Sequence, residues 1–154
     1  MWTNLLDEPM KILGPYEGKP PSLDTFAPHA YSVMLDGVSI EGQFLQLPSN
    51  VPSSWQAWDK PRAYAAFHFS SIRNFEARGL LAAGPEDDSL HGRIVGAPAD
   101  ARLICLSEPF IRSETGEVLK YWKKFELRQS AFSLAIEFGN VSIVCGQRAL
   151  TRLV

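Results

Sequence analysis

Apolar and polar residues alternate along several short stretches of the chain, which is the pattern of β-strands that bury one face. The clearest alternation spans residues 29–35 and resumes over residues 38–44. Between these stretches, Asp36-Gly37 supplies residues that tolerate the positive φ of a tight two-residue turn. Gly42 stands where the alternation shifts, as at a β-bulge. We therefore expect a β-hairpin whose apolar positions are Tyr31, Val33, Leu35, Val38, Ile40 and Phe44.

The same alternation predicts more strands further along the chain. Residues 62–72 form the strongest of these, with Ala65, Phe67 and Phe69 on one face and Tyr64, Ala66 and His68 on the other. Shorter strands are expected at residues 75–81, 94–95, 102–107 and 150–154. Residues 132–138 and 141–145 alternate on either side of Gly139-Asn140, which predicts a second hairpin.

Two segments are less regular. Residues 2–13 predict a short helix capped by Asn4 or Asp7, whose inward positions are Leu5, Leu6, Met10 and Ile12 or Leu13. Residues 107–129 fit a helical stripe and a hairpin around residues 114–117 about equally well. We expect a single domain over residues 1–154 that is mainly β, as an antiparallel sheet, a sandwich or a partly open barrel with one or two short helices. An α+β fold is the alternative.

Composition and charge narrow the possible functions. The 154-residue chain has a net charge of −2, so it lacks the positive field with which proteins bind nucleic-acid phosphates. Its first residues do not resemble a secretory signal, and no stretch is long and apolar enough to cross a bilayer. Cys105 and Cys145 each lie in an apolar run, which predicts buried free thiols rather than a disulfide. A soluble, cytoplasmic protein is expected.

No motif in the sequence specifies a chemistry. His29, His68 and His91 are scattered without the spacing of metal ligands. His68 is expected to be a hydrogen-bonded structural side chain on the strand face opposite Phe67 and Phe69. Those two rings follow the alternation of a core face rather than a base-stacking platform. The sequence therefore predicts no catalytic residue, no metal ligand and no cofactor.

The stretch VPSSWQAWDKP, residues 51–61, places Trp55 and Trp58 in an irregular segment. An indole ring buries a large area and still needs a partner for its N–H, so it suits both core edges and interfaces. We expect Trp55 to anchor this segment to the sheet, and Trp58 with Asp59 and Lys60 to lie nearer solvent.

A tryptophan near the start, a Pro-Ser-Leu, a hairpin with an acidic-glycine turn and a proline-rich stretch leading to a tryptophan follow one another in this chain. In that order they resemble the amino-terminal half of the immunity protein 50 family, small antidotes encoded beside bacterial polymorphic toxins. The matching residues are Trp2, Pro21-Ser22-Leu23, Asp36-Gly37, Pro48, Pro52 and Trp55. Ser54 stands where a basic residue is more usual in the family. The second half of the chain agrees only in its rhythm of short strands.

The resemblance implies a non-catalytic protein that binds and neutralises a cognate toxin in the bacterial cytoplasm by stoichiometric protein–protein interaction. The alternative is a β-rich small-molecule-binding domain or enzyme with a pocket near Trp55, Trp58, Tyr64 and His68. A structural or adaptor domain with another partner is a third class. If the toxin is a basic nuclease, the acidic run of residues 86–88 would mimic phosphates. The candidate partner-binding residues are Trp58, Asp59, Glu86, Asp87, Asp88, Tyr121 and Trp122.

Overall fold

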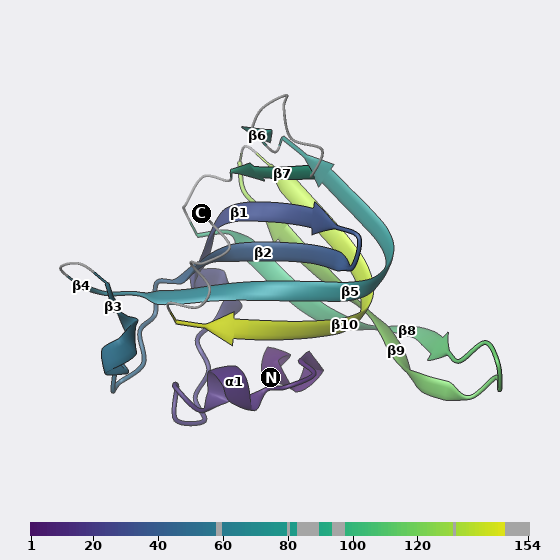
Figure 1. Ribbon diagram of the computed structural model, residues 1–154, viewed down its shortest axis with the longest axis horizontal. Helices are drawn as coiled ribbons and strands as arrows, with labels where there is room; N and C mark the ends of the chain where they lie inside the picture. The colour runs from purple at the N-terminus through teal and green to yellow at the C-terminus, as the bar shows by residue number, and fades with distance from the viewer. Residues whose placement is uncertain (58–59, 80, 83–89, 94–97, 131, 147–154) are drawn as a thin grey trace.

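The computed structural model describes residues 1–57, 60–79, 81–82, 90–93, 98–130 and 132–146. This part of the chain forms an eight-stranded antiparallel sheet in the order β6-β7-β1-β2-β5-β10-β9-β8, together with a two-stranded pair, β3-β4 (Figure 1). Helical structure in the described residues is limited to short turns. The prediction of a mainly β fold with short helices is therefore confirmed.

The helical turns are the 3-10 helices Trp2–Leu5, Leu23–Thr25 and Ser53–Trp55 and the helix α1 (Met10–Leu13). The strands are β1 (Phe26–Met34), β2 (Gly37–Phe44), β3 (Gln56–Ala57), β4 (Lys60–Pro61), β5 (Ala63–Arg78), β6 (Leu81–Ala82), β7 (Leu90–Arg93), β8 (Asp100–Ile111), β9 (Val118–Arg128) and β10 (Ser133–Cys145).

The predicted first hairpin is present as β1 and β2, with its turn one residue earlier than expected. Met34 pairs with Gly37, so Leu35 and Asp36 make the turn and Leu35 is fully exposed rather than inward. Gly37 is required because a Cβ there would lie 1.9 Å from the backbone oxygen of Phe69. The predicted bulge is also present, but its extra residue lies in β1, between Pro28 and Ala30, opposite Gly42.

β5 and β10 are each one long, bent strand, which corrects two predictions. Residues 75–78 continue β5 instead of starting a new strand, and Gly139-Asn140 lies inside β10 instead of forming a turn. The register between the two strands shifts beside Glu137, and nearby Ser71 has a φ of 54°. Both strands curve sharply at this place (Figure 1). Across the bend the buried positions of β10 shift from even-numbered residues (Leu134, Ile136, Phe138) to odd-numbered ones (Val141, Ile143), so the alternation breaks without a turn.

The curled sheet makes a partly open barrel around an aromatic core. Phe125 of β9 packs against Phe67 and Phe69 of β5, with ring centroids 5.4 and 4.9 Å apart, although β10 separates these strands in the sheet. At the opposite edge, the N–H of Ala99 donates to the backbone oxygen of Phe26 at 3.2 Å, which brings the start of β8 close to β1. Phe67 and Phe69 are fully buried, so their assignment to the core is confirmed.

The N-terminal segment packs on this core as two short turns rather than as one helix. Pro9 interrupts the predicted helix, because proline has no N–H to continue the hydrogen-bond ladder, and α1 starts directly after it. Neither Asn4 nor Asp7 caps a helix. The N–H of Asp7 donates instead to Val141 of β10 at 2.9 Å. Met10, expected to face inward, is exposed.

The ambiguous segment of residues 107–129 is a hairpin made by β8 and β9, not a helix. Both cysteines are free thiols, but Cys105 is exposed because it lies on the edge strand β8, so the prediction of a buried thiol is wrong at this position. The strands expected at residues 94–95 and 150–154 lie outside the described residues. Within the described part of the chain, no helix has the length and apolar character needed to span a membrane.

Candidate partner-binding surface

The β8-β9 hairpin extends beyond the rest of the sheet (Figure 1). β10 pairs with β9 only from Lys123 to Arg128, so the earlier residues of β9 pair with β8 alone. We call residues 109–122 the hairpin arm. Residues 111–119 of the arm are all exposed, whereas Phe110, Lys120 and Trp122 at its base are partly buried.

The hairpin arm exposes apolar and aromatic side chains. Tyr121 is 48% exposed, and Val118 and Ile111 are each 51% exposed. Leu119, next to Val118, is exposed as well. Ile111 and Val118 are register partners, so their exposed side chains lie side by side. Exposed apolar side chains that lie together mark an interaction surface, whereas single ones are common on proteins. These side chains lie along a projecting element, from Tyr121 near its base to Ile111 and Val118 near its tip, where a partner has access.

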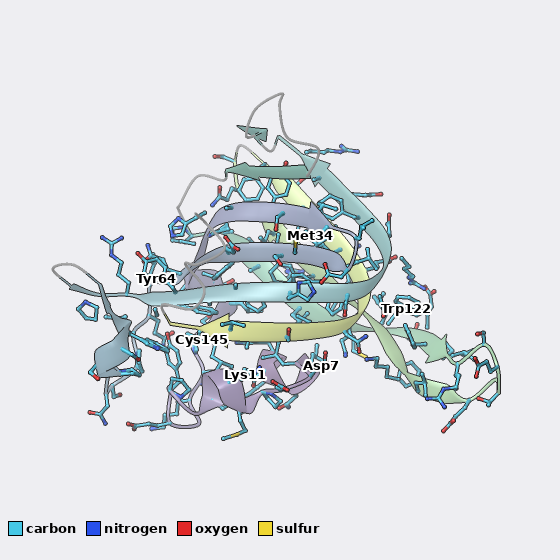
Figure 2. The ribbon with its side chains drawn as sticks, viewed as in Figure 1. Asp7, Lys11, Met34, Tyr64, Trp122 and Cys145 are labelled. Carbon is cyan, nitrogen blue, oxygen red and sulfur yellow. The ribbon has the colours of Figure 1, made fainter. Side chains whose placement is uncertain are left out.

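Arg73 braces the base of the hairpin arm. Its guanidinium donates to Glu108 at 2.6 Å and to Glu137 at 3.1 Å, and it lies 4.7 Å from the centroid of the Trp122 ring. The hydrogen bond from Arg73 lowers the pKa of Glu108 below its usual value. Trp122 in turn packs against Phe110, with centroids 4.8 Å apart. Figure 2 shows Trp122 at this junction, beside the bend of β5 and β10.

A second set of contacts fixes the same junction. The Lys120 ammonium donates to the Asn140 side-chain oxygen, and the Asn140 amide donates to Ser71 Oγ at 3.1 Å. Gly139 lets the Phe110 ring approach β10, since a Cβ at Gly139 would lie 2.7 Å from that ring. The bend therefore contacts the base of the hairpin arm and restricts its orientation relative to the barrel.

Of the predicted partner-binding residues, Tyr121 and Trp122 lie on this surface and have different roles. They are neighbours on β9, so their side chains face opposite ways. Tyr121 is exposed, whereas Trp122 is partly buried in the brace. Trp58, Asp59, Glu86, Asp87 and Asp88 lie outside the described residues, and their role stays a prediction.

Of the residues expected around the alternative pocket, Trp58 lies outside the described residues and the other three lie on different faces of the sheet. Trp55 is buried in the hydrophobic core, as expected, and packs against Tyr16. Tyr64 and His68 lie on the other face of β5, away from the core residues Phe67 and Phe69. The described residues Trp55, Tyr64 and His68 therefore line no common cavity.

Ser39, His68 and Asp36 make a chain of polar contacts on the outer face of the sheet. Ser39 Oγ lies 3.0 Å from His68 Nδ1, and His68 Nε2 lies 3.7 Å from an Asp36 carboxylate oxygen. These residue types act as nucleophile, base and orienting acid in serine hydrolases. Ser39 is fully buried, however, so its hydroxyl cannot meet a substrate. The contacts connect the β1-β2 turn to β5, and His68 has the hydrogen-bond partner that was expected of it.

Sequence reasoning missed the residues that position the hairpin arm, chiefly Arg73, Glu108 and Asn140. The alternation of apolar and polar residues breaks near residues 71–73 and 139–140, where these residues lie or pack. A break of this kind occurs at strand bends as well as at turns, so it does not identify the bend. Among the described residues, no group of His, Cys, Asp or Glu side chains is arranged to hold a metal ion.

Several residues that carry the family resemblance attach the N-terminal segment to the barrel. Trp2 Nε1 donates to the backbone oxygen of Pro21 at 2.9 Å, and its ring stacks on Phe44. Ser22 caps the 3-10 helix Leu23–Thr25 by accepting a hydrogen bond from the N–H of Asp24. These residues hold the fold together and do not by themselves identify a partner.

Comparison of the chain with family models, with curated proteins and with solved structures finds no match. The resemblance to the immunity protein 50 family therefore stays a prediction from the residues that carry it.

Proposed function

We propose that the protein is an immunity protein that binds a cognate bacterial toxin domain in a stoichiometric complex and blocks its activity in the cytoplasm. The observation that carries this proposal is the braced hairpin arm with its exposed apolar side chains. The family resemblance supplies the class of partner.

Pre-organisation makes the hairpin arm suited to tight binding. A flexible loop loses conformational entropy when it binds, whereas an arm that is already fixed keeps more of its contact energy as affinity. The Arg73 brace and the Asn140 contacts fix its base before any partner arrives. Active sites are usually concave, and a projecting element can enter such a site and block it.

The chemistry of the hairpin arm also matches known interface anatomy. Tyr121 offers a large ring with a polar end, a side chain that is frequent among binding hot spots. The apolar residues around it are followed at the tip by Arg112, Glu114 and Glu117, which are exposed and carry both signs of charge. An apolar centre with a charged rim is typical of specific protein interfaces.

Co-expression with the toxin encoded beside the gene tests the proposal. The wild-type protein should restore growth of cells that make the toxin, and the purified pair should form a one-to-one complex. Failure of the wild-type protein to restore growth would rule out the immunity function.

Substitutions then test the hairpin arm as the contact surface. Tyr121→Ala combined with Leu119→Asp should weaken the toxin complex by about 2 kcal/mol or more, which is about thirtyfold in Kd. Met10→Ala is the control, because Met10 is also exposed but lies on α1. Unchanged affinity in the double variant would move the contact surface elsewhere.

A further inference from the structure

A charged groove runs along the outer face of the first part of β10, away from the tip of the hairpin arm. Its volume is about 200 Å³. Ser133 and Ala135 form part of its floor because their side chains are short. Long charged side chains from the neighbouring strands form the walls: Glu76, Arg78, Lys124, Glu126 and Arg128. We call this feature the β10 groove.

The strand register sorts these charges into two opposed pairs. Arg78 of β5 and Arg128 of β9 are both register partners of Ser133, so they face each other across the floor. Glu76 and Glu126 face each other across Ala135 in the same way. β5 and β9 are the two neighbours of β10 in the sheet and are therefore about 10 Å apart, which leaves room for a ligand group between two long side chains. The groove thus presents a basic clamp and, two residues further along, an acidic clamp.

The basic clamp (Arg78 and Arg128) and the acidic clamp (Glu76 and Glu126) differ in how much of their charge is compensated by ion pairs within the groove. Glu126 lies 3.1 Å from Lys124 and 3.9 Å from Arg128, so part of the negative charge of the acidic clamp is compensated within the groove. The Arg128 side chain is 69% exposed, and at 3.9 Å its pair with Glu126 is longer than a hydrogen bond. Two guanidiniums on either side of the Ser133 hydroxyl favour a carboxylate, which accepts hydrogen bonds from both.

The spacing of the clamps selects an extended chain. Residues two apart on β10 are separated by about 7 Å, which is also the distance between alternate side chains of an extended peptide. The groove is continuous with the brace, because Glu137 follows Ala135 on the same face and accepts a hydrogen bond from Arg73. A partner that contacts the Trp122 side of the hairpin arm can therefore reach the groove, whereas Tyr121 faces the other side of β9.

We propose that the β10 groove binds an extended segment of the toxin that carries an acidic and a basic side chain two residues apart. The carboxylate lies between Arg78 and Arg128, and the cation lies between Glu76 and Glu126. This inference rests on the proposed function for the identity of the partner, but the chemistry of the groove can be tested without the toxin.

Acetyl-Glu-Ala-Lys-amide is the probe for that test. Titrated into isotope-labelled protein, it should shift the amide resonances of Ser133 and Ala135 with a Kd in the millimolar range, because exposed ion pairs are individually weak. Added salt should weaken this binding. Acetyl-Gln-Ala-Gln-amide should leave the resonances unchanged, and equal shifts with both peptides would overturn the proposal.

Arg78→Gln combined with Arg128→Gln should abolish the shifts caused by the charged peptide. Lys11→Gln combined with Lys19→Gln is the matched control, since it removes the same charge from an exposed region that is not part of the groove. Thermal unfolding should be alike in both variants and in the wild type. Peptide binding that survives in the groove variant would contradict the inference.

Binding of the toxin is the second test. The groove variant should raise the Kd for the toxin about tenfold and reduce the salt dependence of binding, whereas the control variant should do neither. A toxin that binds the groove variant as tightly as the wild type would overturn the groove as a toxin site. A toxin that does not bind the wild type would overturn the proposed function, and the peptide titration would still decide whether the groove recognises paired charges.

Discussion

Trp55 lies in the connection from β2 to β5, and its ring contacts two distant parts of the chain, Tyr16 and Gly146. Its ring is 6.0 Å from the Tyr16 ring, and a Cβ at Gly146 would lie 2.6 Å from its Nε1 atom. Tyr16 donates its hydroxyl proton to the backbone oxygen of Gln46 at 2.6 Å, and burial raises the pKa of this tyrosine. A single indole thus holds the N-terminal segment, the loop after β2 and the end of β10 together.

Trp55→Ala should lower the free energy of unfolding by about 3 kcal/mol or more, because it leaves a large cavity in the core. Tyr121→Ala should change it by only about 0.5 kcal/mol, since that ring is half exposed. Urea denaturation followed by far-ultraviolet circular dichroism measures both variants. Equal losses would contradict the assignment of one ring to the core and the other to the surface.

The two thiols should differ in reactivity. Burial raises the pKa of Cys145 to about 12, whereas Cys105 is exposed. Because the thiolate is the reactive form, a thiol reagent at about pH 8 should modify Cys105 quickly and Cys145 only after unfolding. Cys105→Ser should remove the fast reaction. A fast reaction that persists in this variant would show that Cys145 is accessible.

Lys123 should make stability depend on pH at the alkaline end. Burial is the main cause that lowers its pKa, Lys120 adds to it, and Asp7 and Cys105 oppose it. The unfolded chain therefore binds more protons between the folded pKa and the ordinary value of 10.5, and stability rises with pH across that window. At neutral pH Lys123 is charged in both the folded and the unfolded protein, so the cost of removing its charge from water lowers the free energy of unfolding in full.

Lys123→Met should therefore raise the free energy of unfolding at neutral pH, and this gain should shrink as the pH approaches 10.5, the ordinary pKa. Urea denaturation at several pH values measures the difference. Lys11→Met is the control, because Lys11 is exposed on α1 and should give no such trend. A gain that stays constant with pH would exclude the buried charge as its cause.

Among the elements, the hairpin arm is stabilised mainly at its base. Its strands pair with each other, but the contacts that orient it come from the bend of β5 and β10 through Arg73, Ser71 and Asn140. Loss of these contacts should free the arm without unfolding the barrel, because the aromatic core does not depend on them.

Arg73→Gln should change global stability only slightly, because exposed ion pairs contribute little to the free energy of unfolding. Hydrogen exchange should become faster in the hairpin arm and stay unchanged in β1 and β2. Lys11→Gln, which breaks the exposed pair with Glu8, serves as the control. Unchanged exchange in the arm would mean that Arg73 does not brace it.

The sequence predicts the elements whose two faces differ clearly. The hairpin of β1 and β2 and the alternation along residues 64–69 are read directly, because burial on one face imposes a period of two. The bend at Gly139-Asn140 is misread because bulges and turns interrupt that period alike. The Arg73 brace has no sequence signal, since its partners come from β8 and β10 and depend on the register between distant strands.

For the molecule as a whole, the bend of β5 and β10 connects the hairpin arm, the β10 groove and the aromatic core. On one side it holds the hairpin arm, on another it continues into the β10 groove, and inside the barrel it carries core residues such as Phe69 and Phe138. A partner that contacts both surfaces would therefore bind across a single rigid junction.

The pairing of β5 with β10 also sets the order of events during synthesis. It joins Arg78 to Ser133 and Ala65 to Cys145, so it forms late, after a long loop has closed. While β10 is still within the ribosome, one edge of β5 has no strand beside it and is open to wrong pairings with other chains. The speed at which β10 docks therefore determines how soon a newly made chain can bind any partner, whatever its final affinity.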